Sequence, residues 1–453
     1  MERGIAPLIK LLARARSPKA AALVMRTAVQ EMCAPASGAY RLLALPKPGF
    51  TEDVIATFGA DPRFDVRSLG RGVVKAVFPA FLPPHLDDNN YRAASPEIGD
   101  AKLKLRAFWA AAWPTLQRKA RSDAVLTGNF GYYAEQELAA AVEAHGVPFI
   151  AMHKEALKTP GLESFFAELY STRRQAFAGR RVLTYNQIER SIQIRAGVAS
   201  ADRISVCGMP RLDRSHQWRR AAANGRAAAG DGRPRILFFG FHPKTGLPAI
   251  PRKAAALTGA RLERLPPAIE GLAWAKLCSE CYRAMYEIAL RNPGIEVVIK
   301  GKGDLLKWAR VTDGPSISDG QLPNLRVHIG GDPQDLIAAA TVVSGFNTTA
   351  LLEGVASGKA VVVPRFAEAA EATYAPYFLD LGDAVEVATS AEQYVAMLVR
   401  RAFYSARPQA ELAPPTIAIL QHWAGNADGL ASRRVANAVA AEIDAARGRT
   451  GPA

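Results

Sequence analysis

The chain has 453 residues, which is more than one hydrophobic core usually serves, so we expect two domains of roughly 200 residues each. Its composition, 49% hydrophobic and 22% charged, is typical of a soluble globular protein, and no apolar run approaches the roughly 20 residues that span a bilayer. The net charge of +15 indicates an anionic partner, but nucleic acid is not expected because zinc-finger spacing, an RNA-recognition signature and basic blocks interleaved with aromatics are all missing.

The first 32 residues form a basic, amphipathic segment that is expected to be helical. It lacks the uninterrupted apolar stretch and the cleavage site of a secretory signal, so we expect a cytoplasmic location. Two interpretations of the segment remain open. It packs its apolar side chains on the first domain, or it rests on the anionic inner face of a membrane through its basic side chains, Lys10, Arg14, Arg16, Lys19 and Arg26.

Strands then alternate with helices along the first half of the chain. Strands are expected at 40–46, 64–69, 123–129, 147–152, 180–186 and 203–210, and helices at 51–60, 101–120, 134–146 and 187–198. We expect the long helix to be interrupted near Pro114. This alternation predicts βα units and a mostly parallel sheet.

A shift to arginine, alanine and glycine between Pro210 and Pro234 predicts a boundary between two domains. Beyond it, strands are expected at 235–240, 295–300, 324–329, 341–344 and 360–364, and helices at 272–290, 304–311, 332–340 and 347–358. The sequence thus predicts two tandem doubly wound Rossmann-like α/β domains with a cleft between them. Residues 1–212 form the first domain, 213–233 a linker, 234–410 the second domain, and 411–453 C-terminal helices that either cap the second domain or cross back to the first.

Four cysteines are too few for a disulfide framework, and two of them form a single CxxC motif, Cys278 and Cys281. Both lie on one helical face with apolar neighbours, which are Trp274, Leu277, Met285 and Ile288. Packing in the core therefore explains the motif better than redox or metal chemistry does.

The loops that follow four strands of the second domain all contain glycine, and two contain lysine. Ligands of open parallel sheets bind at the carboxyl ends of the strands, glycine lets a ligand approach the backbone, and lysine supplies charge for phosphate. These loops predict a site for a nucleotide diphosphate. Its candidate residues are Gly240, His242, Lys300, Lys302, Ser344, Gly345, Asn347, Thr348, Thr349 and Glu353.

Within this set, Asn347 is expected to cap the helix that follows. That would leave the Thr348 and Thr349 hydroxyls for phosphate oxygens and Glu353, on the same helical face, for a ribose diol. Each of these residues taken alone is equally explained by helix capping in a protein that binds nothing there.

The segment HIGGDPQDLIAAATVVSGFNTTALLEGVASGKAVVVPRF resembles the donor-binding half of glycosyltransferases with the GT-B architecture, and more narrowly bacterial surface-carbohydrate and capsule enzymes. AGVASADRISVCGMPRLDR is similar to the segment with which such chains leave the first domain, and VVIKGKGD to their lysine-bearing strand end. The resemblance covers parts of residues 181–366. It implies sugar transfer from a nucleotide-activated donor to a hydroxyl, without a catalytic metal or other cofactor. The implied diphosphate contacts are Lys300, Ser344, Asn347, Thr348, Thr349 and Glu353.

One departure from the family bears on mechanism. Retaining members often carry two glutamates across this helix start, whereas here only Glu353 is present and Gly345 stands where the first would fall. This favours an inverting mechanism, in which a side chain of the first domain deprotonates the acceptor hydroxyl. The candidate bases are Glu155, His153 and Glu135, and each is also explained as a surface or capping residue.

The expected partners are a nucleotide-sugar donor and a glycan or lipid-linked acceptor. Three other functions share this fold and these loops: a nucleotide-sugar 2-epimerase, a polyol-phosphate transferase with a CDP-linked donor, and a non-catalytic nucleotide-binding component of a polysaccharide export apparatus. The epimerase is disfavoured because SGFNTTALLE replaces the glycine-glutamate pattern that such enzymes usually carry at this helix start.

Overall fold

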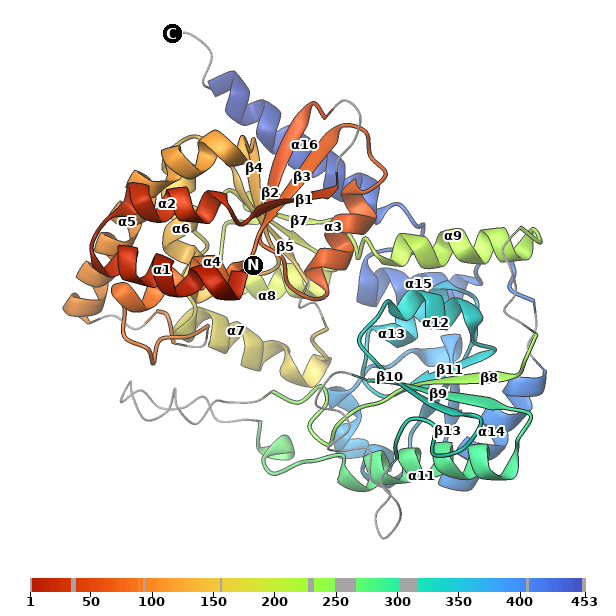
Figure 1. The fold of residues 1–453 in the computed structure, drawn as a ribbon. Helices are drawn as coiled ribbons and strands as arrows, with labels where there is room; N and C mark the ends of the chain where they lie inside the picture. Colours follow the sequence, from red (N-terminus) through yellow and green to blue (C-terminus); the bar gives the residue numbers. More distant parts are fainter. Residues whose placement is uncertain are drawn as a thin grey trace.

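The computed structural model describes residues 2–33, 38–88, 90–92, 95–154, 157–226, 232–248, 266–301, 317–404 and 407–449. Two α/β domains, each with its own sheet, make up this part of the chain (Figure 1). Among the described helices, none has both the length and the apolarity needed to cross a bilayer.

The first domain is built on a seven-stranded sheet with the order β1-β3-β2-β4-β5-β6-β7. Strand β1 is antiparallel to β3 at one edge, and every other adjacent pair is parallel. The residues of β4 and β5 are buried throughout, as in parallel sheets covered by helices on both faces. The strands are β1 (Val29–Cys33), β2 (Tyr40–Ala44), β3 (Phe64–Leu69), β4 (Ala124–Thr127), β5 (Phe149–His153), β6 (Arg181–Thr184) and β7 (Ile204–Val206).

Helices cover this sheet, and most were expected from the sequence. They are α1 (Glu2–Arg14), α2 (Pro18–Arg26), α3 (Phe50–Phe58), α4 (Arg71–Val77), α5 (Pro96–Ala120), α6 (Gln136–Ala144), α7 (Glu163–Arg173) and α8 (Gln187–Arg195). Strand β1 differs from the prediction, because most of its residues lie in the N-terminal segment that was expected to be helical. Its pairing with β3, a long-range contact, decides its conformation.

Helix α5 runs unbroken through Pro114, so the interruption expected there is wrong. Ser95 caps the helix, its hydroxyl accepting a hydrogen bond from the Ile98 N–H at 3.2 Å. Trp109 and Trp113 are buried in the core of the domain. Burying these two large side chains stabilises the helix more than the hydrogen bond that proline cannot donate would have done.

The second domain is built on a six-stranded sheet with the order β10-β9-β8-β11-β12-β13, and every adjacent pair is parallel. The strands are β8 (Arg235–Phe239), β9 (Glu296–Gly301), β10 (Leu325–Ile329), β11 (Val342–Gly345), β12 (Ala360–Pro364) and β13 (Glu386–Ala388). The described helices around them are α11 (Ala275–Arg291), α12 (Pro333–Ala339), α13 (Ala350–Ala356) and α14 (Ala391–Phe403).

The CxxC motif lies in α11, and both cysteines are buried in the core of the second domain. Burial raises the pKa of the Cys278 thiol to about 12 and that of Cys281 well above its ordinary value. Thiols of such pKa stay protonated at neutral pH. The prediction that these cysteines serve packing is therefore confirmed.

Each sheet has one point at which successive strands are added on opposite sides. In the first sheet it lies between β2 and β4, and in the second between β8 and β11. Ligands of doubly wound sheets bind beyond the carboxyl ends of the strands at such switch points. The strand orders confirm two doubly wound Rossmann-like domains, the arrangement that GT-B architecture denotes, and each domain offers one such edge.

Three helices join the two domains. Helix α9 (Leu212–Ala223) occupies the beginning of the segment expected to be a linker and packs on α12 and α13. After α15 (Pro414–Ala424), helix α16 (Ala431–Arg449) crosses back to the first domain and packs on α3 (Figure 1). Its apolar stripe joins the core on that face of the first sheet through Val435, Val439 and Ile443. The cleft expected between the domains stays a prediction.

Candidate active site

The loops after β8 and β11 meet at the switch point of the second sheet. Gly246 has a φ of +74°, and a Cβ there would lie 1.8 Å from Asn347 Nδ2, so only glycine fits. Asn347 itself has a φ of +52°. Its Nδ2 donates to the Tyr377 carbonyl at 3.2 Å, and its Oδ1 accepts from the Leu379 N–H at 3.2 Å. Asn347 therefore fastens this loop to the chain at 377–379.

The capping role expected of Asn347 is wrong. Helix α13 begins at Ala350, with Thr349 at the N-cap position and no side-chain cap. Thr348 Oγ1 accepts a hydrogen bond from the Ala350 N–H at 3.4 Å. The left-handed backbone of Asn347 places its side chain away from the helix start, toward the 377–379 segment. Thr348 and Thr349 stay half-buried at the loop surface.

Ser344 and Gly345, also expected to bind the donor, are buried inside the domain. The Ser344 hydroxyl donates to the Val362 carbonyl at 2.6 Å and lies 2.5 Å from the Tyr394 hydroxyl. A Cβ at Gly345 would lie 3.1 Å from the Phe239 Cβ. Both residues thus pack β11 against its neighbours in this structure.

Lys300, Gly240 and His242 lie on the same edge of the sheet as these loops. Lys300 is half-buried in β9, and its Nζ donates to the Gly301 carbonyl at 3.4 Å. Gly240 N–H donates to the Lys300 carbonyl at 3.0 Å, which ties the loop after β8 to β9. His242 is exposed, and its Nδ1 accepts from the Lys244 N–H at 3.0 Å. Lys302 lies outside the described residues.

Glu353 is buried in α13, and both of its carboxylate oxygens are engaged by the protein. Oε1 accepts from Arg211 Nε at 3.3 Å, and Oε2 accepts from Gln334 Nε2. Burial raises the pKa of Glu353 above its ordinary value, although Arg211 and Gln334 both favour the charged form. A ribose hydroxyl would have to share this carboxylate with Arg211 and Gln334.

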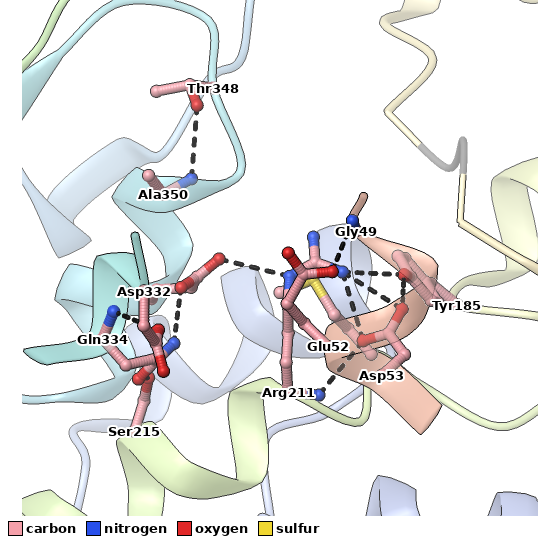
Figure 2. A network of polar contacts seen from close by, with 12 residues as sticks. Gly49, Glu52, Asp53, Tyr185, Arg211, Ser215, Asp332, Gln334, Thr348 and Ala350 are labelled. Carbon is pink, nitrogen blue, oxygen red and sulfur yellow. Dashed lines mark hydrogen bonds and ion pairs between the residues drawn. The ribbon is translucent and has the colours of Figure 1, made fainter. Parts of the chain in front are cut away.

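Arg211 connects Glu353 to the first domain. Figure 2 shows Arg211 beside Asp53 and Tyr185. Its Nη1 donates to both carboxylate oxygens of Asp53 at 3.2 Å and to the Tyr185 hydroxyl at 2.8 Å, and that hydroxyl donates in turn to Asp53. Gln334 receives a hydrogen bond from Ser215 Oγ at 2.8 Å. A single guanidinium thus bridges a carboxylate of α3 and a carboxylate of α13.

The charges of this bridge are strongly coupled. Burial disfavours the guanidinium cation, yet Tyr185, Asp53 and Glu353 outweigh this and raise the pKa of Arg211 far above its ordinary value. Burial also raises the pKa of Asp53, against the opposing effect of Arg211. The sequence offers one weak signal for this site, which is that Arg211 follows Pro210 at the exit from the first domain.

Of the three candidate bases, His153 is wholly buried at the carboxyl end of β5. Its Nε2 lies 2.9 Å from Glu189 Oε1, and its Nδ1 has no hydrogen-bond partner among the described residues. Tyr170 and Gln193 also donate to that Glu189 oxygen, at 3.2 and 2.9 Å. Glu155 lies outside the described residues.

Glu135, the third candidate, is buried behind the loop that follows β4. Its carboxylate accepts hydrogen bonds from Arg71 Nε and from Thr127 Oγ1. Burial raises its pKa, and Arg71 and Thr127 oppose the shift. Within the described ranges, no group of three or more His, Cys, Asp or Glu side chains is placed to hold a metal ion.

The chain matches no protein-family model, and no protein of assigned function matches it by sequence. Among solved structures, UDP-GlcNAc 2-epimerase from Neisseria meningitidis bound to UDP-GlcNAc is similar over 88% of this chain and 98% of its own, at 12% identity and a TM-score of 0.47. Trehalose 6-phosphate synthase from Burkholderia multivorans is similar over 91% of this chain and 99% of its own, at 14% identity and a TM-score of 0.42. MurG from Acinetobacter baumannii is similar over 88% of this chain and 98% of its own, at 14% identity and a TM-score of 0.38. At this level of similarity, no activity carries over to this chain.

Proposed function

We propose that this protein is a glycosyltransferase that moves a sugar from a nucleotide-activated donor to a hydroxyl acceptor. One observation carries the proposal. The loops after β8 and β11 are adjacent at the switch point of the second sheet. Thr348 and Thr349 lie in the loop after β11, and Lys300 lies near the end of β9, on the other side of β8. The resemblance of residues 181–366 to GT-B enzymes supports the same assignment and favours surface-polysaccharide or glycoconjugate synthesis.

In this proposal the donor diphosphate lies on the loops after β8 and β11. The Thr348 and Thr349 hydroxyls donate to its oxygens, Lys300 offsets its charge, and His242 lies in the loop after β8 beside it. Glu353 accepts a hydrogen bond from the ribose, held in place by Arg211 and Gln334. These groups stabilise the diphosphate as it leaves, without a metal or other cofactor.

The acceptor hydroxyl then needs a base from the first domain. His153 and Glu155 are proposed first and Glu135 after them, and an inverting reaction follows from attack opposite the leaving group. In support of His153, Glu189 lies 2.9 Å from one ring nitrogen, and the other, Nδ1, has no hydrogen-bond partner among the described residues. Glu135 is tied to Arg71 and Thr127, which favours a structural role for that carboxylate.

Contact with an anionic membrane surface is a further part of the proposal, with a lipid-linked glycan as the acceptor. Helix α1 buries Ile9 and Ala13 against the domain, so the packing interpretation accounts for one face. The other face exposes Leu8 and Leu11, which are 45% and 62% exposed, next to the exposed Arg14. Exposed leucines flanked by cations fit the boundary of an anionic bilayer at the inner face of a membrane.

The test of the donor site is a panel of UDP, GDP, CDP, CMP and ADP measured by thermal stabilisation. We expect at least one nucleoside diphosphate to raise the melting temperature of the wild type, and the Thr348→Val/Thr349→Val double variant to lose most of that rise. Thr27→Val, an exposed threonine of the first domain, serves as the control and should keep it. No shift with any nucleotide would contradict the donor site, and a shift confined to CDP would favour the polyol-phosphate transferase.

A further inference from the structure

The switch point of the first sheet carries cations of its own. Strands β3, β2 and β4 are adjacent and parallel, and the switch point lies between β2 and β4. Arg71 comes two residues after the end of β3, Lys47 three residues after β2, and the loop 128–133 directly after β4. Because parallel strands end on one edge, these groups lie at the place where a doubly wound sheet binds ligands.

Two of these cations lie over the face of one buried aromatic ring. The Arg71 Cζ lies 3.7 Å from the centre of the Tyr132 ring, and the Lys47 Nζ lies 4.4 Å from it. The ring is 2% exposed. Stacking on an aromatic face orients a cation without neutralising it.

The guanidinium of Arg71 is only partly satisfied by the protein. Its side chain is 11% exposed, and its Nε donates to Glu135. Its Nη2 is buried and has no hydrogen-bond partner among the described residues. A buried charged donor without an acceptor is costly, so an oxygen from a ligand would stabilise this arrangement.

A third cation reaches the same loop from α7. Arg174 Nη1 donates to Asn129 Oδ1 at 3.4 Å, and its Nε is buried without a partner among the described residues. Lys75 also lies beside the loop, its Nζ 5.6 Å from the centre of the Tyr133 ring. The carboxylates of Glu135, Asp87 and Asp88 are near the same groups, and an Asp88 oxygen accepts from the Tyr133 N–H at 2.8 Å. Arg71 and Arg174 thus each leave one buried N–H donor without an acceptor among the described residues.

We propose that this edge of the first domain is an oxyanion site, in which Arg71, with Lys47 and Arg174 beside it, binds a phosphate or carboxylate group. A planar guanidinium with an unused N–H matches either oxyanion. Its role rests on the proposed function, which takes the base for the acceptor hydroxyl from the first domain and so places the acceptor there. The acceptor is then an anionic molecule, which is held by its charged group while its hydroxyl is presented to the donor.

Calorimetric titration of the full-length protein with inorganic phosphate, at physiological ionic strength, tests the site. We expect Arg71→Gln to weaken phosphate binding at this site at least tenfold, and Lys104→Gln, an exposed lysine of helix α5 in the same domain, to leave it unchanged. Because Arg71→Gln leaves Glu135 buried without its cation, the Arg71→Gln/Glu135→Gln double variant is measured as well and should show the same loss. A parallel titration with acetate tells a phosphate site from a carboxylate site.

The donor site also attracts phosphate, so the Thr348→Val/Thr349→Val variant separates the two. We expect it to retain the phosphate binding that Arg71→Gln weakens. If only the proposed donor site fails, the wild type still binds phosphate in an Arg71-dependent manner. Phosphate and acetate binding that is absent from the wild type, or equal in wild type and both Arg71 variants, would overturn the oxyanion site.

Discussion

The side chains of the candidate donor edge divide into those that hold the protein together and those that face outward. Ser344 and Asn347 are engaged with Val362, Tyr377 and Leu379. Thr348 and Thr349 are left at the loop surface, and Lys300 lies in β9, two strands away from β11. The two threonines are therefore the better targets for substitution, because changing them disturbs little of the core.

A second feature at the scale of single residues is the buried His216 of α9, whose Nε2 lies 3.2 Å from the Asn426 carbonyl oxygen. Burial lowers its pKa to about 4. Since the unfolded chain binds the proton near pH 6.5, stability is full above that pH and is lost as pH falls toward 4. From this residue alone, the protein should be about 2 kcal/mol less stable at pH 5 than at pH 7.

Replacing His216 with Gln removes this titration and keeps a side-chain amide for the Asn426 carbonyl. We expect the melting temperature of the wild type to fall a few degrees more between pH 7 and pH 5 than that of His216→Gln. Carboxyl groups titrate in both proteins, so the difference between them isolates the histidine. An equal fall in both would show that His216 does not titrate between the folded and unfolded states.

The residues that bridge the domains could not be predicted from the sequence. Asp53 and Arg211 are 158 positions apart, and Arg211 and Glu353 are 142 apart. Local pattern carries no information about such pairs. Glu353 was identified from its place after Thr349, but its partners Arg211 and Gln334 follow from how the two domains pack.

At the scale of elements, helices and strands were predicted where a periodic apolar pattern coincides with burial. The strands from β2 to β12 show this, because each contains buried apolar residues and strands alternate regularly with helices along the chain. Each error has its own physical cause: packing keeps α5 helical through Pro114, β1 forms by long-range pairing with β3, and Asn347 adopts a left-handed backbone that removes it from the helix cap.

The exposed face of helix α1 can be tested for binding to a membrane surface. We expect the protein to sediment with vesicles of phosphatidylcholine and phosphatidylglycerol, and much less with phosphatidylcholine alone, because each basic residue near an anionic surface contributes about 1 kcal/mol. The Leu8→Glu/Leu11→Glu variant should lose most of this binding. These side chains are exposed, so the fold should tolerate the change.

Leu290→Glu, on the surface of α11, is the matched control, because that leucine is 54% exposed and lies in the second domain. It should sediment like the wild type. Equal sedimentation of wild type and the Leu8→Glu/Leu11→Glu variant would leave α1 with its packing role alone.

At the scale of the whole molecule, the two domains are joined by more than the chain between them. Helix α16 is part of the core on one face of the first sheet, and Arg211 bridges Asp53 and Glu353. On another side, Gly161 of the first half lies against the Tyr377 ring, which a Cβ at that position would approach to 2.6 Å. The proposed donor site, through Glu353, is thereby tied to the placement of the first domain.

Removing Arg211 tests this bridge. Arg211→Gln leaves Asp53 and Glu353 buried without their cation, which should cost about 3–5 kcal/mol at neutral pH. The loss should shrink as pH falls, because without Arg211 the pKa values of both carboxyls rise further and protonation then relieves the burial. Calorimetric melting at pH 7.5 and pH 5.5 measures both effects.

Arg214→Gln is the control for this experiment. Arg214 also forms ion pairs, with Asp332 and Asp335, but its side chain is 52% exposed, so its loss should change the melting temperature little. If the two variants melt alike at pH 7.5, the bridge through Arg211 does not stabilise the molecule.

The central claim is that the switch point of the second sheet holds a nucleoside diphosphate. A crystal structure of the protein with the nucleotide that stabilises it most tests this directly. We expect the diphosphate oxygens within hydrogen-bond distance of the Thr348 and Thr349 hydroxyls, with the ribose toward Glu353. Density for the nucleotide at any other place on the molecule would contradict the claim.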